Sequence, residues 1–437
     1  MKLGSSPYEQ YKVSDNEWCE YLPSVWQEKR VKNIFNLITD LAPDNNDFEL
    51  LSLYTSIGVK PRKEMEQRGN KSVTTDGYWI VKKGDIIVNK LLAWMGAIGL
   101  SEYDGVTSPA YDILRKFNNE VDEKFYTYLF RTEKAQAIFK KYSRGIMDVR
   151  LRLYFDKFGA ITVPFPPPSE QKEIANYLDN KTAQIDRKID LLTEKAKLYN
   201  NLKQSLINET VTRGLDKTVP MKNSGIEWIG EIHEHWEICR IKDTVKKIGN
   251  GVTPRGGSEV YTDSGIPFLR SQNVYDDGLR LDNVSFIPAK IHDDMRSSQL
   301  KAGDILINIT GASIGRTCMV PVELGAANIN QHIAFVRIKY WFNVSYLSFF
   351  LKSHSAKKYI QIEQNGASKE AFNLSQIANI PLVLPPLSEQ KKIADYLDSK
   401  TAQIDQIIAT INTQIEKLKE LRKTLINDVV TGKIKVV

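Results

Sequence analysis

Apolar residues recur at alternating spacings of four and three along two long stretches of the chain. In the first stretch they are Ile185, Ile189, Leu192, Ala196 and Tyr199, and in the second they are Ile404, Ile408, Ile411, Ile415 and Leu418. This alternation places the side chains on one face of an α-helix, as in the seam of a coiled coil. The seam is extended by Leu202 and Leu206, and by Leu421 and Leu425. Neither stretch contains proline or glycine, so we expect two helices of about forty residues that pair with each other.

The two helical stretches begin with nearly the same sequence. Residues 166–186 read PPPSEQKEIANYLDNKTAQID and residues 385–405 read PPLSEQKKIADYLDSKTAQID, with 17 of 21 positions identical at an offset of 385 − 166 = 219. The prolines exclude helix before them, and Ser169 and Ser388 are predicted N-caps. A repeat of this length indicates a duplicated domain with its helix. Because both seams share one register, we disfavour the alternative of two unrelated amphipathic surface helices.

Each helix is preceded by segments that also occur twice. Residues 12–32 and 222–242 share Lys, Ser, Glu, Trp and Arg positions at an offset of 210, and their tryptophans are expected to pack onto the domain. A Gly-Asp turn followed by a β-branched run predicts a buried strand in residues 83–89 and again in residues 302–308. Residues 121–144 and 344–362 are predicted helices, whereas residues 35–80 are expected to be irregular and polar.

The predicted fold class is α/β (α+β), with two mixed globular domains separated by two long antiparallel helices that form a coiled coil. If the helices were parallel, the chain would have to run back along the whole helix before the second helix could begin, whereas antiparallel helices need no such return. Antiparallel pairing also relates the two halves of the chain by an internal pseudo-twofold axis. In chain order we expect a first globular domain at 1–165, a long helix at 166–213, a linker at 214–223, a second globular domain at 224–384 and a second long helix at 385–437.

Composition restricts the location and the partners. The formal net charge is +7, which is compatible with a nucleic-acid partner. The three cysteines, Cys19, Cys239 and Cys318, are widely spaced and odd in number, which favours a reducing compartment. No run approaches the length of a membrane span, so we expect a cytoplasmic protein with no membrane partner.

The sequence contains no recognisable catalytic constellation. The tetrads Asn-Pro-Pro-Tyr and Asp-Pro-Pro-Tyr of adenine methyltransferases are absent, as are a P-loop and a nucleophile elbow. No metal site is expected, because no Cys/His cluster has metal-ligand spacing and the close pair His233 and His235 is interpreted as solvent-facing. These absences favour a binding protein.

Basic and amide side chains in predicted loops are the candidates for contact with DNA, since arginine binds guanine edges and phosphates. The stretch 58–63 is interpreted as an exposed basic loop, and residues 251–257 and 265–271 as a mobile polar loop. The candidates in the first domain are Lys60, Arg62, Lys63, Arg144 and Arg150, and those in the second domain are Arg255, Arg270, Asn273 and Arg316. The alternative for each is a solvated surface charge.

The chain resembles the specificity (S) subunit of type I restriction–modification systems. The resemblance is carried by the doubled PPxSEQKxIAxYLD start, by Gly303–Asn308, by the segment 251–270 and by Asn328–His332. The resemblance covers nearly the whole chain. It implies a non-catalytic subunit in which two recognition domains each read half of a split site in double-stranded DNA. It also implies docking to methyltransferase subunits and, through them, to restriction subunits. No cofactor is then expected in this chain, with S-adenosylmethionine, ATP and Mg²⁺ on the partner subunits.

Duplicated surface positions on the two helices imply two copies of one partner, here a methyltransferase subunit. The positions predicted to bind it are Tyr177, Leu178, Tyr396 and Leu397. Two other functions remain open at this point: a methyltransferase or nuclease with an unrecognised active site, and a coiled-coil scaffold that does not bind DNA.

Overall fold

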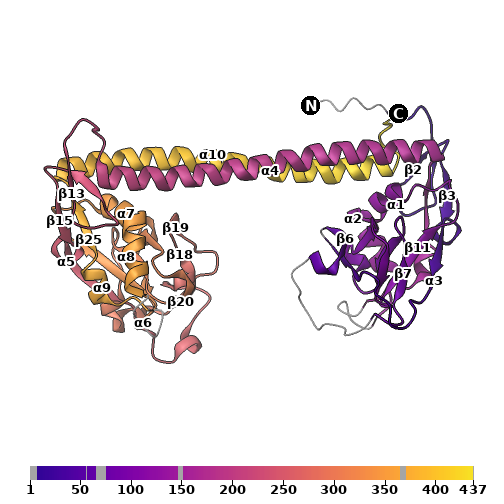
Figure 1. Cartoon of the computed structure of the whole chain (residues 1–437). Coiled ribbons are helices and arrows are strands. Elements are labelled where there is room, and N and C mark those ends of the chain that lie inside the picture. Colours follow the sequence, from indigo (N-terminus) through magenta and orange to yellow (C-terminus); the bar gives the residue numbers. More distant parts are fainter. Residues whose placement is uncertain (1–6, 56, 65–74, 146–150, 365–370, 437) are drawn as a thin grey trace. The chain divides into compact units, whose positions relative to one another are not determined.

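The computed structural model describes residues 7–55, 57–64, 75–145, 151–364 and 371–436. The chain divides into two compact units, Met1–Leu192 with Thr413–Val437, and Thr193–Asn412. Each unit contains a mixed α/β domain and a part of each of the two long helices, α4 (Pro168–Arg213) and α10 (Leu387–Val430) (Figure 1).

The first unit is built on a four-stranded antiparallel sheet with the order β4-β11-β8-β9. Its strands are β4 (Phe35–Ile38), β8 (Ile86–Asn89), β9 (Ile98–Leu100) and β11 (Tyr111–Lys116). Four two-stranded pairs surround the sheet. They are β1 (Tyr11–Val13) with β2 (Tyr21–Pro23), β3 (Gln27–Arg30) with β12 (Thr162–Phe165), β5 (Leu51–Tyr54) with β6 (Gly58–Pro61), and β7 (Trp79–Val81) with β10 (Gly105–Thr107). The helices α1 (Glu123–Phe130), α2 (Glu133–Tyr142) and α3 (Phe155–Phe158) supply much of the core.

The second unit repeats the same sheet, with the order β16-β24-β21-β22. Its strands are β16 (Val245–Asn250), β21 (Ile305–Asn308), β22 (Thr317–Met319) and β24 (Ile333–Ile338). The remaining strands are β13 (Met221–Asn223), β14 (Glu231–His233), β15 (Glu237–Arg240), β17 (Ile266–Leu269), β18 (Val274–Tyr275), β19 (Gly278–Leu279), β20 (Ser285–Ile287), β23 (Asn328–Ile329) and β25 (Pro381–Leu384). The helices are α5 (Ile241–Thr244), α6 (Ala289–Asp294), α7 (Val344–Lys352), α8 (His354–Gln364) and α9 (Leu374–Ala378). Strand β13 occupies the last three residues of the predicted linker and pairs with β14.

The predicted Gly-Asp turns fix the central strand of both sheets. Strands β8 and β21 follow these turns and are buried along their whole length, as predicted. In the second unit Gly303 has φ +80°, a left-handed conformation that favours glycine. The buried Asp304 then accepts the backbone N–H of Lys301 at 2.8 Å and pairs with Arg337 on β24, at 2.7 and 2.6 Å. Asp85 and Arg115 make the same pair in the first unit, so the turn is tied to the neighbouring strand.

Three local predictions were wrong. Residues 35–80 hold strands β4 to β7, and the predicted basic loop at 58–63 begins with β6, whose Val59 and Pro61 are buried. Residues 265–271 are not a loop, because Ile266–Leu269 pairs as β17 with β20 and β23. The predicted helices at 121–144 and 344–362 are each two helices. In the first pair Thr132, which lies between the two helices, caps α2 by accepting the N–H of Ala135.

Each long helix begins one residue before the serine that was predicted to cap it. Pro168 is the first residue of α4 and Leu387 the first of α10, so Ser169 and Ser388 lie inside the first turn and are not N-caps. Proline suits this first position because its missing N–H has no intrahelical partner there.

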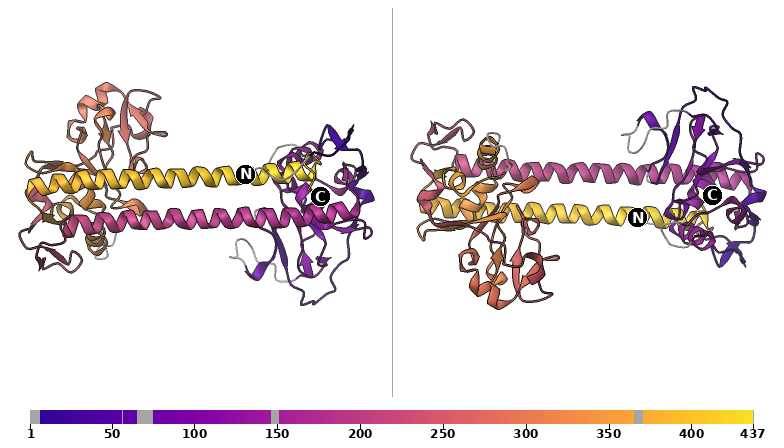
Figure 2. Two further views of the ribbon diagram at one scale, coloured as in Figure 1. Left: turned by 90° about the horizontal axis from the view of Figure 1, so that it is seen from above. Right: turned by 90° about the horizontal axis from the view of Figure 1, so that it is seen from below.

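The two helices run antiparallel within each unit (Figure 2). In the first unit Ile174 and Leu178 near the start of α4 share a core with Leu425 and Val429 near the end of α10. In the second unit the end of α4 packs with the start of α10, through Ile207 and Val211 beside Ile393 and Leu397.

The predicted seam is correct for its first five positions in each helix and for Leu206 and Leu425, but not for Leu202 and Leu421. Leu202 is 53% exposed and Leu421 is 39% exposed, whereas Leu206 is half-buried and Leu425 is buried. The alternation of four and three places the seam position four residues after Tyr199 and Leu418, at Lys203 in α4 and Arg422 in α10. Leu202 and Leu421 therefore lie one residue before the seam.

The Glu and Gln of each Ser-Glu-Gln sequence hold the helix to its domain. Glu170 accepts the indole N–H of the fully buried Trp26 at 2.9 Å, and Glu389 accepts that of Trp236 at the same distance. The prediction that the tryptophans pack onto the domain is therefore confirmed for these two. Gln171 accepts the backbone N–H of Asp122, the N-cap of α1, and Gln390 accepts that of Asn343, the N-cap of α7, both at 2.9 Å.

Candidate nucleic-acid interface

The candidate DNA-binding residues of the first unit differ in their surroundings. Lys60, on β6, donates to the hydroxyl of Tyr103 at 3.0 Å, a hydrogen bond that raises the pKa of the lysine. Lys63 is exposed and forms an ion pair with Glu49. The backbone N–H of Arg62 donates to the carbonyl of Leu50 at 2.8 Å, which fixes the start of a 3-10 turn next to β6.

Arg144 is exposed directly after α2. Its backbone forms a two-hydrogen-bond bridge with Arg152, each N–H donating to the other residue's carbonyl at 2.9 Å. The bridge places a second, unpredicted arginine beside the first. Arg150 lies outside the described residues.

In the second unit Asn273 has a structural role that corrects its prediction as a DNA contact. It is 2% exposed, it accepts the backbone N–H of Arg270 at 2.9 Å, and it donates to the carbonyl of Arg280 at 2.8 Å. Both the oxygen and the nitrogen of its side-chain amide therefore form hydrogen bonds with backbone groups. Arg270 itself is half-buried, with its guanidinium over the ring of Tyr261, and Arg255 is exposed.

Two arginines flank one tyrosine on the β18–β19 hairpin. The guanidinium of Arg316 lies 4.6 Å from the ring centroid of Tyr275, and that of Arg280 lies 5.1 Å from it. Arg280 also pairs with Asp277 at 2.5 Å. Arginine–aromatic stacks present guanidinium edges together with a planar π surface, both of which suit nucleic acid.

Arg316 is predicted from the sequence, whereas Tyr275 and Arg280 are not. The signal for them is the sequence Tyr-Asp-Asp-Gly-Leu-Arg, whose Asp and Gly residues favour a hairpin turn. In the structure Asp276 and Asp277 form the turn, and Gly278 pairs with Tyr275. A hairpin here brings the tyrosine and the arginine together.

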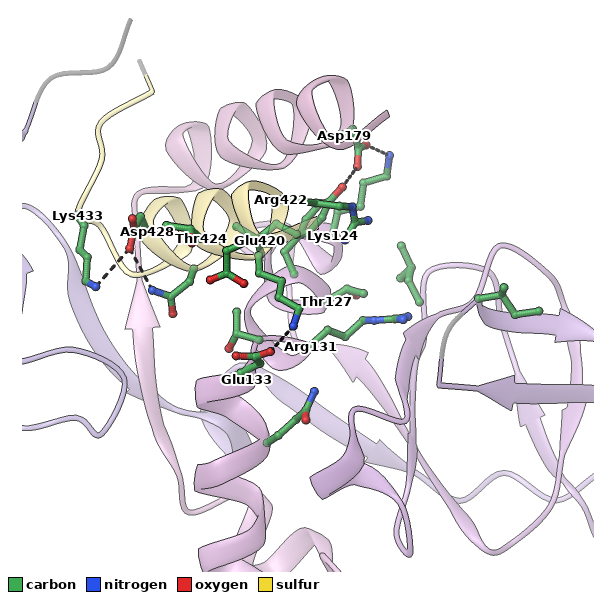
Figure 3. A pocket seen from close by; sticks show the side chains of 18 of the residues that line it. Lys124, Thr127, Arg131, Glu133, Asp179, Glu420, Arg422, Thr424, Asp428 and Lys433 are labelled. Atoms are coloured by element: carbon green, nitrogen blue, oxygen red, sulfur yellow. Dashed lines mark hydrogen bonds and ion pairs between the residues drawn. The ribbon is translucent and has the colours of Figure 1, made fainter. Parts of the chain in front are cut away.

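Each unit has a hollow beside the helix pair. The hollow of the first unit, of about 1090 Å³, lies between α1, α2 and the last turns of α10 (Figure 3). The smaller hollow of the second unit, of about 480 Å³, has Tyr275 and Arg316 in its wall. Asp179 and Arg422 in the first correspond, at the offset of 219, to Asp398 and Lys203 in the second.

Charges within the first hollow are balanced. The first is lined by the cations Lys124, Arg131, Arg422, Lys423 and Lys433 and by the acids Glu102, Glu133, Asp179, Glu420 and Asp428. Figure 3 shows two of its ion pairs, Lys124 with Asp179 at 2.7 Å and Lys433 with Asp428 at 3.2 Å. Lys423 also pairs with Glu133, at 2.7 Å. A phosphate backbone requires an excess of cations, so this balance favours a protein surface as the occupant.

One cation in each hollow is poorly solvated. Burial lowers the pKa of Arg131, next to α1, and also the pKa of Lys352, the last residue of α7. Arg131 donates to the carbonyls of Thr55 at 2.7 Å and Ile98 at 3.3 Å, so it supports the domain from within.

Two of the four predicted partner-binding residues are corrected by burial. Leu178 and Leu397 are fully buried in the cores of their units and cannot contact a partner subunit. Tyr177 and Tyr396 are half-buried, and burial raises the pKa of Tyr177. The sequence places tyrosine and leucine side by side, but only one of two adjacent helix positions can face outward.

The solvent-facing prediction holds for His235, whose side chain is 45% exposed, and is wrong for His233, which is 1% exposed. The ring of His233 packs on the fully buried Trp236, with ring centroids 4.5 Å apart. Strand β14 turns inward at this point, which its acidic neighbours in the sequence do not indicate.

Comparison with known proteins identifies the family. Residues 23–197 and 233–417 match the family described as Type I restriction modification DNA specificity domain. The chain is 26% identical over 363 residues to the type I restriction enzyme MjaVIII specificity subunit of Methanocaldococcus jannaschii, covering 80% of this chain and 81% of that protein.

Solved structures show the same fold. A chain of a type I R-M system has a TM-score of 0.71 at 18% identity, over 94% of this chain and 99% of that chain. The HsdS subunit from Thermoanaerobacter tengcongensis has a TM-score of 0.54 at 18% identity, over 94% of this chain and 98% of that chain.

The chain therefore belongs to the family of type I restriction–modification specificity subunits and carries its domain twice. Its function is recognition of a DNA target, without catalysis by this chain. Across the part of the chain that the structure describes, no helix is long and apolar enough to cross a membrane.

Proposed function

We propose that the chain recognises a bipartite site in double-stranded DNA, with one half-site read by each domain. The observation that carries this proposal is the double family match, in which each copy includes one domain and one helix start. Each copy also repeats the same sheet order and the same Glu–Trp hydrogen bond. Two equivalent binding units on one chain suit two half-sites on one duplex.

In the second domain the proposed contact surface is the arginine–tyrosine stack. Arg316, Tyr275 and Arg280 lie together on neighbouring turns, and Arg255 and Arg270 are the further candidates. In the first domain the candidates are Lys60, Arg62, Lys63 and Arg144, with Arg150 as a prediction outside the described residues. Arginine can bind a guanine edge with two hydrogen bonds, which distinguishes one base pair from the others.

The test is to map methylated sites made by the chain with its methyltransferase subunits. Arg280→Ala with Arg316→Ala should relax or shift one half-site by about 10-fold or more in preference and leave the other half unchanged. Arg144→Ala should affect only the opposite half. An equal loss of selectivity at both halves would contradict the assignment of one half-site to each domain.

The helix pair is proposed to dock two methyltransferase subunits. Leu202 and Leu421 occupy equivalent positions, 421 − 202 = 219 residues apart, and both are exposed although they are large and apolar. A duplicated exposed leucine fits a duplicated apolar contact. Tyr177 and Tyr396 are the further candidates, and both are half-buried. Restriction subunits would join through the methyltransferases, and S-adenosylmethionine, ATP and Mg²⁺ would bind to partner subunits, with no cofactor in this chain.

Stoichiometry tests the docking proposal. Leu202→Glu should reduce the number of methyltransferase subunits per chain from two to one in native mass spectrometry, as should Leu421→Glu, because each charge would enter an apolar contact. Lys197→Glu is the control, since five residues turn the helix by about 140° and place it on another side. A single partner per unmodified chain, or loss with the control, would refute the proposal.

A further inference from the structure

Three potential metal ligands meet where the second domain joins its long helix. They are His233 at the end of β14, His235 in the turn after it, and Glu389 in the first turn of α10. One ligand atom from each residue lies within 4.8 Å of the other two. The histidines and the glutamate are more than 150 positions apart in the sequence, at 389 − 235 = 154, so the cluster exists only in the folded unit.

The buried histidine lacks the hydrogen bonds that its burial requires. Both ring nitrogens of His233 are buried with no hydrogen-bond partner within the described structure, and the residue is 1% exposed. A buried, unpaired polar group costs free energy, commonly about 1–3 kcal/mol. A ligand bound to one ring nitrogen would remove part of that cost, and an imidazole nitrogen is a metal ligand when neutral.

The other two ligands are already oriented. The two carboxylate oxygens of Glu389 have different partners. Oε2 accepts the indole N–H of Trp236 at 2.9 Å, and Oε1 lies 2.7 Å from Nε2 of His235. The indole hydrogen bond fixes the carboxylate plane, as outer partners of metal ligands do. His235 has a side chain that is 45% exposed, which leaves a path for an ion and room for a water ligand.

We propose that His233, His235 and Glu389 form a binding site for a divalent transition-metal ion of the zinc class. Two imidazoles and one carboxylate suit Zn²⁺, Co²⁺ or Ni²⁺, whereas Mg²⁺ and Ca²⁺ prefer oxygen ligands alone. With three protein ligands, a water molecule completes the coordination. The ion would link the segment 231–236 to the first turn of α10 and so stabilise the junction of this domain with its helix.

The first half of the chain supplies an internal comparison. At the offset of 210, Pro23 and Val25 stand where the second half has His233 and His235, and Glu170 corresponds to Glu389. There Glu170 accepts hydrogen bonds from Trp26 and Tyr8. Proline and valine cannot ligate a metal, so the proposal predicts one ion per chain and not two.

Titration of the untagged, full-length chain with Zn²⁺ in a metal-free buffer tests the proposal. Calorimetry should give one site per chain. At zinc concentrations about 100 times the dissociation constant, the melting temperature should rise by about 5 °C. Co²⁺ should give visible absorption bands that saturate at the same ratio.

The decisive variant is His235→Val, which installs the residue found in the first half. His235 is exposed, so its replacement should leave the fold intact while lowering zinc affinity at least 10-fold. His354→Ala removes another exposed histidine of the same unit and should change nothing. The absence of binding in the unmodified chain, or equal binding in His235→Val, would overturn the proposal. DNA recognition plays no part in this measurement.

Discussion

The Nζ atom of Lys203 on α4 lies 2.6 Å from Oδ2 of Asp405 on α10, and the equivalent pair, Arg422 and Asp186, meets at 3.0 Å in the other unit. The residues of both pairs are related by the offset of 219. In each unit a cation therefore occupies the place that an apolar residue would take in a continued seam. Lys203, whose side chain is only 17% exposed, covers apolar surface with its carbon chain while its charge is paired.

Charge reversal tests this pairing. Lys203→Glu or Asp405→Lys alone should destabilise the second unit by about 0.5–1 kcal/mol, because like charges then face each other across the helices. The double variant should recover most of the loss in urea denaturation. Lys195→Glu, at an exposed position on the same helix, is the control for a change in net charge. If the double variant lost as much stability as the two single variants together, the ion pair would contribute nothing to stability.

The buried aspartates of the Gly-Asp turns should be among the most sensitive positions. Asp304→Asn should destabilise the second unit by about 3–5 kcal/mol, because it leaves Arg337 without its bidentate carboxylate and the pair is largely buried. Asp85→Asn should have the same effect on the first unit. Differential scanning calorimetry can resolve which transition shifts. Asp282→Asn, at an exposed residue, should shift neither, and an equally small effect of Asp304→Asn would refute the proposed role.

Acid should weaken the first domain through Glu17. Hydrogen bonds from Lys141 at 2.8 Å and Tyr142 at 2.7 Å lower the pKa of this carboxyl group. A lowered folded-state pKa gives a stabilisation that is fully present above the unfolded pKa, about 4.3, and is lost as the pH falls through the folded value. The effect should be below about 1 kcal/mol because the pair is near the surface.

The measurement for Glu17 is the melting temperature of the chain and of Glu17→Gln from pH 7 to pH 3. The variant should be less stable at pH 7, and the difference should vanish toward pH 3. Glu20→Gln, at an exposed position, serves as the control. A difference that grows as the pH falls would have the wrong sign for this mechanism.

The helix pair is predicted to set the distance between the two half-sites. Because the helices are antiparallel, seven residues should be inserted in both, after Leu192 and after the equivalent Ile411. Seven residues preserve the seam and add about 10 Å, which is about three base pairs of B-DNA. Methylation mapping should find both half-site sequences unchanged and the gap between them longer by about three base pairs.

Two controls accompany this insertion. Seven residues placed after Lys217, in the exposed turn that follows α4, should leave the gap as it is. A proline at the helix positions should break the helix and abolish bipartite recognition. An unchanged gap after the paired insertion would mean that the spacing is set elsewhere.

Much of the candidate DNA-binding surface could not be predicted from the sequence, because it depends on contacts between segments that are distant in the chain. Basic residues were expected in loops, yet Lys60 lies on strand β6, which pairs with β5. The side chain of Asn273 hydrogen-bonds to the backbone of its own turn and is not available to DNA. Tyr275 and Arg280 form a stack with Arg316, which lies in the turn between β21 and β22. Contacts of this kind depend on which strands become neighbours, and strand order is not encoded in local composition.

The sequence by itself determined the duplication, the two long helices, the buried strands after the Gly-Asp turns and the family, because these are carried by repeated residues and by local periodicity. Only the tertiary structure decided which helix positions are covered, because burial depends on what packs against each face of the helix. It turned Leu178 and Leu397 inward and left Leu202 and Leu421 outside. It also brought Glu389 to His233 and His235, because a strand turn and a helix start distant in sequence pack against the same tryptophan.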